Sequence, residues 1–224
     1  MRASTRPRVK ICCISSRDEA RMAIEHGAAA VGLVSAMPSG PGVISEEQIA
    51  EIAASVPPPI GTFLLTAQQD AESIIAQQRR CRTNTIQIVD RLIQGSYEDL
   101  RRALLGISIV QVVHVSGEES IEEAIAVAAH VDAILLDSGK PKLTIKELGG
   151  TGRRHNWTLS RQIREQIDIP LFLAGGLTPE NVRDAVQQVG PFGLDICTGV
   201  RREGKLDEEK LQALFANLNF ASRV

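Results

Sequence analysis

The alternation of short apolar runs with polar segments is the feature that most constrains the fold of this chain. Runs rich in valine, isoleucine and leucine are each followed by a segment with helical spacing, and this couplet occurs eight times in 224 residues. The expected strands are residues 8–14, 29–35, 60–66, 85–89, 107–115, 133–138, 170–174 and 193–197. Eight couplets with no long linker and no change in composition predict one (β/α)8 TIM barrel with parallel strands, spanning residues 1–224 as a single domain.

Four of the expected helices begin with residues that favour a helix N-terminus. Ser45 and Ser96 each precede a cluster of acidic or amide side chains, Thr178 is followed by Pro179, and Asp207 precedes two glutamates. Such side chains accept hydrogen bonds from the free N–H groups of a first helical turn, and proline fits the first helical position. These residues support the helices that the spacing predicts.

The positions of the glycine-rich stretches distinguish a barrel from a doubly wound open sheet. An open sheet usually has fewer couplets and often a glycine-rich turn after its first strand, but residues 14–19 read ISSRDE. The stretches GGTG at 149–152, AGGL at 174–177 and CTGV at 197–200 follow late strands instead. In a barrel these loops meet at the C-terminal face, where phosphate commonly binds. The simpler interpretation is that each is only a tight turn between a strand and a helix.

Composition excludes several classes of partner. With a formal net charge of −2, the chain offers no strongly basic surface for nucleic acid or an anionic membrane. No apolar stretch approaches the roughly 20 residues that span a bilayer, and the N-terminus lacks the apolar middle of a signal peptide, so we expect a cytoplasmic protein. The four cysteines are therefore expected to be free thiols. Without a CxxC pair and with scattered histidines, we expect no metal site.

Strand alternation separates the neighbouring cysteines of the stretch VKICC. Val9, Ile11 and Cys13 fall on one face, and Lys10 and Cys12 on the other. The apolar set suits the layer between strands and helices, so we expect Lys10 and Cys12 to point into the barrel, with Cys12 near its catalytic end. Cys13 is then expected to have only a structural role.

Two aspartates are placed inside the barrel by the same alternation. Asp137 ends the sixth strand, where it is either a cap for the following turn or a general acid whose pKa is raised by partial burial. Asp195 lies on the eighth strand, and we expect it to pair with Lys10. His114, at the end of the fifth strand, is expected to be a packed or hydrogen-bonded histidine rather than an acid or base.

These residues resemble the phosphoribosylanthranilate isomerase family along nearly the whole chain. The matching stretches are VKICC, GAAAVGLV, ILLDS, GGTGRRHNW, FLAGGLTPENV and GLDICTGV, in the family's order and at plausible spacing. The resemblance implies a TIM barrel that performs an Amadori rearrangement in tryptophan biosynthesis. The reaction converts N-(5'-phosphoribosyl)anthranilate to a 1-deoxyribulose 5-phosphate product. A phosphorylated sugar is then the partner, with no nucleic acid, membrane, metal or organic cofactor, and the chain is expected to be a monomer or homodimer.

The resemblance also implies roles for individual residues. Cys12 matches the family's general base and Asp137 its general acid, and the charge of Lys10 would help to keep the Cys12 thiol deprotonated. The implied substrate- and phosphate-binding residues are Lys10, Gln87, Gly150, Gly152, Gly175, Gly176, Asp195, Thr198 and Gly199.

Three departures from the family pattern concern the end of the site that would hold the anthranilate. The family's S-P-R after the second strand, whose arginine binds the carboxylate, is GPG here, with Gly42 in the arginine's place. At the end of the fourth strand Q-L-H-G becomes QIVD, with Val89 and Asp90 replacing histidine and glycine. Cys13 replaces the glycine that follows the catalytic cysteine.

These departures leave alternatives open. Arg91, Lys142 or Arg154 would rescue anthranilate binding by replacing the lost cation, and otherwise the chain is a sugar-phosphate isomerase with a different aglycone. The histidine-pathway isomerase uses paired aspartates in a similar barrel, so Cys12 argues against it. A non-catalytic phosphate-ligand binder would give no reason to keep both Cys12 and Asp137. A structural scaffold would not need the phosphate loops.

Overall fold

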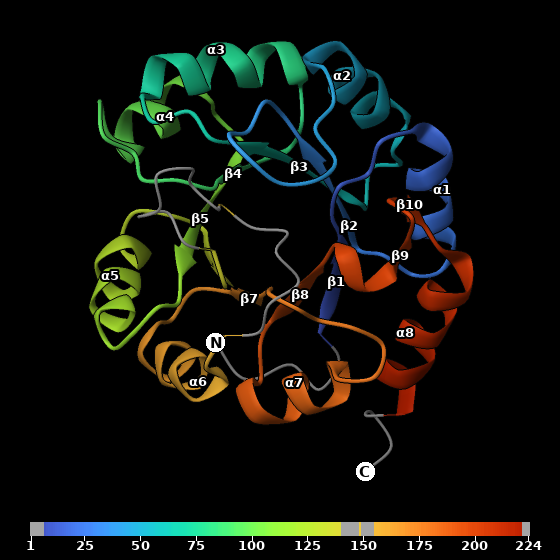
Figure 1. The fold of residues 1–224 in the computed structure, drawn as a ribbon. Helices are drawn as coiled ribbons and strands as arrows, with labels where there is room; N and C mark the ends of the chain where they lie inside the picture. The colour runs from blue at the N-terminus through green and yellow to red at the C-terminus, as the bar shows by residue number, and fades with distance from the viewer. Residues whose placement is uncertain (1–6, 140–147, 149–154, 221–224) are drawn as a thin grey trace.

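The computed structural model describes residues 7–139, 148 and 155–220, and its centre is a closed barrel of parallel strands (Figure 1). Neighbouring strands pair in the order of the sequence, and the ring closes between the first and the last. The strands are β1 (Arg8–Ile11), β2 (Ala30–Val34), β3 (Gly61–Thr66), β4 (Thr85–Ile88), β5 (Ser108–His114), β6 (Ala133–Asp137), β7 (Leu171–Leu173) and β8 (Gly193–Ile196).

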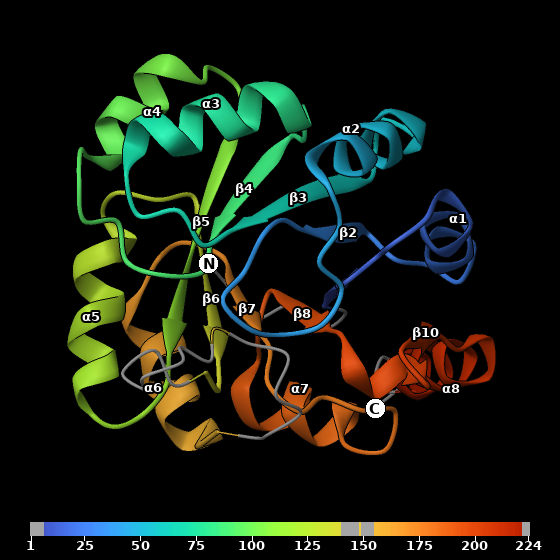
Figure 2. The same cartoon turned by 45° about the horizontal axis from the view of Figure 1, so that its top comes forward.

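Helices surround this barrel as an outer layer, which both ribbon views display (Figures 1 and 2). They are α1 (Arg17–Glu25), α2 (Glu46–Ser55), α3 (Ala71–Cys81), α4 (Tyr97–Ala103), α5 (Glu119–Ala128), α6 (Trp157–Gln166), α7 (Val182–Val189) and α8 (Glu208–Phe220). Between β8 and α8 come the 3-10 helix η1 (Thr198–Val200) and a hairpin of β9 (Arg201–Arg202) with β10 (Lys205–Leu206). Within the described ranges no helix is long and apolar enough to cross a membrane.

The predicted barrel is therefore confirmed, and every predicted strand has its counterpart. The largest difference in length is at β1, which ends at Ile11 rather than at residue 14. The closing pair of strands sets Lys10 opposite Asp195 and Ile11 opposite Ile196. This register places the two charged residues on the same side of adjacent strands.

Side chains from the strands form two apolar layers, as alternation predicts. Ile11, Ile134 and Leu194 belong to the outer layer, which packs against the helices. The inner layer fills the barrel and includes Phe63 and Phe172, whose rings meet edge to face at 5.9 Å between centroids. The barrel interior is thus a packed core, and in this fold ligands bind at the C-terminal end.

The predicted N-terminal residues are correct for α2, α4 and α8. Ser45 and Ser96 each form a capping box with the third residue of the helix that follows. Asp207 Oδ1 accepts a hydrogen bond from the backbone N–H of Lys210 at 3.0 Å. These contacts fix the residue at which each helix begins.

The start of α7 differs from the prediction, because the helix begins at Val182 rather than just after Thr178. The Asn181 side chain accepts a hydrogen bond from the Thr178 N–H at 3.0 Å and donates one to the Gly176 carbonyl at 2.8 Å. These two bonds hold a turn over residues 178–181, so proline lies in that turn and not in the helix.

Candidate active site

A pocket opens at the C-terminal ends of the strands, where the loops after β1, β2, β7 and β8 meet. Its described lining residues are Cys12, Cys13, Val34, Met37, Ser39, Gly40, Pro41, Leu65, Gln87, Val89, Asp137, Leu148, Ala174, Gly175, Gly176, Leu177, Asp195, Cys197 and Thr198. In a TIM barrel this is the face that carries active sites. Cys12, Asp137, Gln87, Asp195, Gly175, Gly176 and Thr198, all predicted from the sequence, lie together here.

A buried ion pair lies beneath the pocket. The Lys10 Nζ atom donates a hydrogen bond to Asp195 Oδ1 at 2.7 Å, and the Lys10 side chain is completely buried. Burial alone lowers the pKa of Lys10, but Asp195 and Cys12 outweigh it and hold that pKa above its usual range. Lys10 therefore remains a cation, as the predicted pairing with Asp195 requires.

Cys12 faces the pocket directly above this cation. The pKa of its thiol is lowered, first by a hydrogen bond from Cys13 and then by the charge of Lys10, and these effects outweigh burial. A β-carbon at Gly32 in β2 would lie 2.8 Å from both Cys12 Sγ and Lys10 Nζ. Gly32 thus provides the space that the two side chains occupy. Its position inside a strand is the sequence signal for such a close approach, although it was not among the predicted site residues.

The expectation that Cys13 faces the helices is wrong. Because β1 ends at Ile11, alternation no longer applies, and Cys13 takes a left-handed backbone conformation with φ of 62°. This turns its side chain into the pocket, where its Sγ lies 2.6 Å from Cys197 Sγ. Hydrogen bonds with Cys12 and Cys197, together with burial, raise the pKa of the Cys13 thiol.

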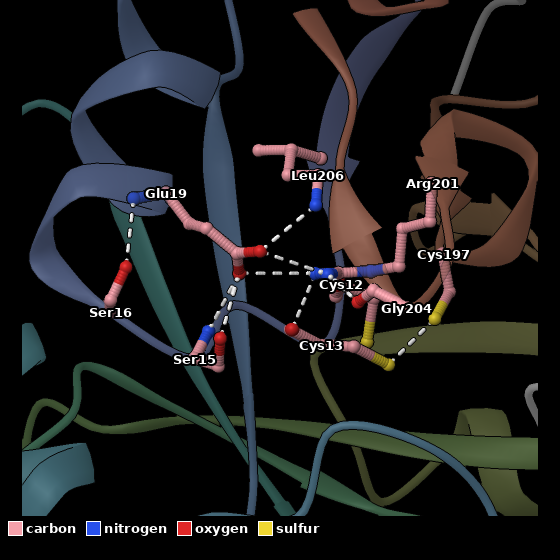
Figure 3. Close-up of polar contacts among 9 residues, drawn as sticks. All are labelled: Cys12, Cys13, Ser15, Ser16, Glu19, Cys197, Arg201, Gly204 and Leu206. Atoms are coloured by element: carbon pink, nitrogen blue, oxygen red, sulfur yellow. Dashed lines mark hydrogen bonds and ion pairs between the residues drawn. The ribbon is translucent and has the colours of Figure 1, made fainter.

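Arg201 holds the backbone of both cysteines in place (Figure 3). Its Nη2 atom donates to the carbonyl oxygen of Cys12 at 3.2 Å and to that of Cys13. Its Nη1 atom donates to Glu19 Oε1 at 3.0 Å, and the same oxygen accepts the Leu206 N–H at 2.9 Å. This network ties the segment after β1 to α1 and β10. The sequence does not predict it, because no local pattern links Glu19 to a residue so distant in the chain.

Asp137 reaches the pocket from β6, three strands away from Cys12 around the ring. Burial raises the pKa of its carboxyl, and the nearby Asp195 adds to this, while the Ser138 N–H and His114 partly oppose it. The Ser138 N–H donates to Asp137 Oδ1 at 2.7 Å. His114 Nε2 lies 2.9 Å from the Val89 carbonyl oxygen, so it is a hydrogen-bonded histidine as predicted.

Backbone groups shape the opposite end of the pocket. Gly175 and Gly176 have positive φ angles of 83° and 62°, and Thr198 begins the 3-10 helix η1. Gly199 passes so close to the loop after β7 that a β-carbon there would lie 2.0 Å from the Leu177 carbonyl oxygen. Closely packed glycine loops beside a helical turn are suited to a phosphate group, because their N–H groups can point at it.

The remaining predicted binding residues are one amide and two glycines. The Gln87 side-chain oxygen is buried beside the pocket and has no hydrogen-bond partner among the described residues. Such an atom is normally satisfied by a ligand or water. Gly150 and Gly152 lie outside the described residues.

Comparison with known proteins decides what this barrel is. Residues 9–217 match the family model of N-(5'-phosphoribosyl)anthranilate (PRA) isomerase. The chain belongs to the PRA isomerase family. The PRA isomerase of Methanosarcina acetivorans is 32% identical over 92% of this chain and 90% of its own length.

Solved structures of PRA isomerases have the same fold. The Thermotoga maritima enzyme is 30% identical, with a TM-score of 0.78 over 96% of this chain and 99% of its own. Another structure, 29% identical with a TM-score of 0.76, is a complex with reduced 1-(o-carboxyphenylamino)-1-deoxyribulose 5-phosphate, and it covers 96% and 99% of the two chains.

The position where the PRA isomerase pattern has its carboxylate-binding arginine is sterically closed here. Gly42 has a φ of 79°, and a β-carbon on it would lie 2.5 Å from the Cys13 β-carbon. A longer side chain is excluded while Cys13 keeps its conformation. The departures from the family pattern at Gly42 and Cys13 are therefore coupled, since the Cys13 side chain fills the space beside Gly42.

The described lining of the pocket contains no lysine or arginine that would replace that arginine. Arg91 does not serve, because its guanidinium is paired with Glu123 at 2.9 Å and is largely exposed outside the pocket. Lys142 and Arg154 lie outside the described residues. Val34, Met37 and Val89 make this part of the wall apolar. The described part of the chain also has no cluster of three histidine, cysteine or acidic side chains placed to hold a metal ion.

Proposed function

We propose that this chain isomerises PRA to 1-(o-carboxyphenylamino)-1-deoxyribulose 5-phosphate, with Cys12 as general base and Asp137 as general acid. The observation that carries the assignment is that both side chains line one pocket with their pKa values displaced in useful directions. The thiol has a lowered pKa and the carboxyl a raised one. A lowered thiol pKa favours the thiolate that a base needs, and a raised carboxyl pKa favours the protonated form that an acid needs.

The proposed reaction begins with proton transfer from Asp137. The carboxyl protonates the ribose ring oxygen, the bond from that oxygen to C1 breaks, and the nitrogen lone pair forms a protonated Schiff base. The Cys12 thiolate then removes the proton from C2, which gives an enolamine. Protonation at C1 and loss of the C2 hydroxyl proton complete the aminoketose. Lys10 assists by keeping a positive charge beside the thiolate before and after the transfer.

The substrate phosphate is proposed to bind at the glycine loops. Gly175 and Gly176 present successive backbone groups in left-handed conformations, and Thr198 and Gly199 present the first N–H groups of η1. These donors carry no net charge, so they hold the dianion by aligned dipoles and hydrogen bonds. Gly150 and Gly152 are proposed for the same role from the sequence resemblance. Binding the phosphate there leaves the ribose between Cys12 and Asp137.

Steady-state turnover of PRA tests this proposal. Wild-type chain is compared with the Cys12→Ala, Asp137→Asn double variant and with Cys81→Ala, which removes a buried thiol in α3. The wild type and the Cys81 variant should turn over PRA, and the double variant should be at least about 10²-fold slower, the minimum usual for one acid or base. Wild-type turnover no faster than that of the double variant would rule the proposal out.

A sugar-phosphate isomerase with an uncharged aglycone is the second candidate function. The observation that favours it is the apolar, cation-free described wall near Gly42 and Val89. Losing a charged hydrogen bond costs about 1.5–3 kcal/mol. Comparing kcat/KM for PRA with that for the phosphoribosyl derivative of aniline, which lacks the carboxylate, separates the two candidates. Preference for the aniline compound supports the second candidate, and preference for PRA supports the first.

A further inference from the structure

Three thiols converge at the mouth of the pocket, and the proposed chemistry uses only one of them. Cys197 Sγ lies 2.6 Å from Cys13 Sγ (Figure 3). The Cys13 thiol in turn lowers the pKa of the Cys12 thiol beside it. The two outer thiols come from opposite ends of the chain, Cys13 after β1 and Cys197 after β8. Because β1 and β8 close the barrel, these loops are neighbours in space.

The contact between Cys13 and Cys197 is held by the surrounding structure. Arg201 anchors the carbonyl groups of Cys12 and Cys13, and Cys197 directly precedes η1. A disulfide has an S–S bond of about 2.05 Å, so two sulfurs already in contact need little backbone movement to join. Cys12 and Cys13 are adjacent in sequence and can pair only through a strained ring. Cys13 and Cys197 are therefore the favoured pair.

We propose that Cys13 and Cys197 form a reversible disulfide on exposure to a hydroperoxide, and that this modification switches off the proton transfer assigned to Cys12. All three thiols line the pocket, but Cys197 is only half-buried, whereas Cys12 and Cys13 are each 5% exposed. A peroxide entering the pocket thus meets Cys197 first. The thiol proton of Cys13 is the donor that lowers the pKa of Cys12, and a disulfide has no such proton.

The chemical steps balance with hydrogen peroxide as the oxidant. The Cys197 sulfur attacks one peroxide oxygen, the O–O bond breaks, and the other oxygen leaves as water, giving a sulfenic acid. The Cys13 sulfur attacks the sulfenic sulfur, the S–S bond forms, and the S–O bond breaks with release of a second water. Two thiols lose two electrons and two protons, and the peroxide is reduced to two waters. A dithiol reverses the modification.

The test follows the cross-link and the turnover separately. Reduced full-length chain is treated with hydrogen peroxide, free thiols are alkylated, and a non-reduced tryptic digest is analysed by mass spectrometry. The expected product joins the peptide of residues 11–17 to that of residues 184–201, with the loss of two hydrogens. It should persist in Cys12→Ser and Cys81→Ala, and disappear in Cys13→Gly, Cys197→Ser and after dithiothreitol. An absent cross-link, or oxidation of Cys12 alone, would overturn the proposal.

Turnover of PRA before and after peroxide tests the switch, which rests on the proposed function, whereas the cross-link does not. Wild-type kcat should fall by about 10²-fold or more, in line with loss of a general base, and return with dithiothreitol. Cys197→Ser should keep its own starting rate under the same dose. A cross-linked chain with undiminished turnover would contradict the switch. If the untreated chain does not turn over PRA, the proposed function is wrong. The digest of Cys12→Ser then still shows whether the disulfide forms.

Discussion

Gly42 and Cys13 occupy one site between them, because a β-carbon on Gly42 would lie 2.5 Å from the β-carbon of Cys13 and 2.9 Å from its Cα. Both residues also have positive φ angles, 79° for Gly42 and 62° for Cys13. The bulk added after Cys12 thus explains why the neighbouring loop carries a glycine where the family pattern has arginine. A chain with both side chains would have to rearrange one of the two loops.

This coupling predicts a non-additive pair of substitutions. Gly42→Ala alone should lower the free energy of unfolding by about 1–3 kcal/mol through overpacking, and by clearly less in a Cys13→Gly background. A double-mutant cycle by urea denaturation should give a coupling of about 0.5–3 kcal/mol. Gly106→Ala is the matched control, because Gly106 has the same φ of 79° with nothing within 4 Å. Additive effects would show that the two positions are independent.

The buried pair of Lys10 and Asp195 should be essential to the fold. Asp195→Asn leaves the Lys10 cation buried without its partner, and we expect a loss of about 3–5 kcal/mol in the free energy of unfolding. Arg161→Ala breaks the exposed pair with Glu165 in α6 and serves as control, with an expected loss below about 0.5 kcal/mol. Equal losses in the two variants, measured by denaturant unfolding, would contradict the assignment of Lys10 as a buried cation.

Gly32→Ala is expected to harm both catalysis and stability. Its β-carbon would lie 2.8 Å from Cys12 Sγ and Lys10 Nζ, and 3.0 Å from Lys10 Cε. Because the Lys10 side chain is completely buried and paired with Asp195, overpacking should lower the free energy of unfolding by about 1–3 kcal/mol, and the base is displaced. A displacement of about 1 Å can cost about 10²-fold in rate, and kcat for PRA should fall accordingly. Gly61→Ala, at the start of β3, is the control and should leave kcat unchanged. A wild-type kcat in Gly32→Ala would refute this role.

The Asp137 side chain should lower the stability of the chain at neutral pH, although the proposed reaction needs it. Because burial raises its pKa in the folded chain, the folded state favours the protonated carboxyl. The resulting stabilisation is fully present below the ordinary carboxyl pKa and is lost as the pH rises through the raised value. Asp137→Asn is therefore expected to melt at a higher temperature than the wild type at pH 7, with a smaller difference at pH 4. A variant less stable than the wild type at pH 7 would contradict the raised pKa.

The pH dependence of turnover follows from the directions in which the pKa values of Cys12 and Asp137 are shifted. Activity should rise with pH as the Cys12 thiol loses its proton, with a midpoint below the usual thiol pKa. It should fall again as Asp137 loses its proton, with a midpoint above the usual carboxyl pKa. Cys13→Gly removes the main hydrogen bond to the thiolate, so the limb of the profile that is set by Cys12 should move to higher pH. The kcat/KM profile of the two proteins checks this shift, and an unmoved limb would count against the hydrogen bond.

The sequence was sufficient for the barrel and for most of the pocket. Couplet spacing located all eight strands, and alternation correctly set Lys10 against Asp195 and turned Asp137 inward. Alternation failed at Cys13 because it holds only while the strand continues, and here the chain leaves the strand in a left-handed conformation. Strand boundaries taken from a local pattern can be wrong by a few residues, and β1 stops at Ile11 rather than at the predicted residue 14.

Long-range contacts account for the rest of what the sequence could not predict. Arg201 and Glu19 lie 182 residues apart, and only the closing of the barrel brings them together. The contact of Cys13 with Cys197 arises in the same way, across the seam between β1 and β8. Gly32 did carry a signal, since a lone glycine inside an apolar strand indicates a close approach by other atoms. Its partners are clear only from the structure.

The most direct test of the account is cleavage of the C2–H bond of PRA. Substrate labelled with deuterium at ribose C2 is given to the wild type, to Cys12→Ala and to Cys81→Ala, and loss of the label from C2 is followed by mass spectrometry. The account predicts that the wild type and Cys81→Ala break the C2–deuterium bond at similar rates, while Cys12→Ala is at least about 10²-fold slower. Loss of the label at the wild-type rate in Cys12→Ala would contradict the central claim.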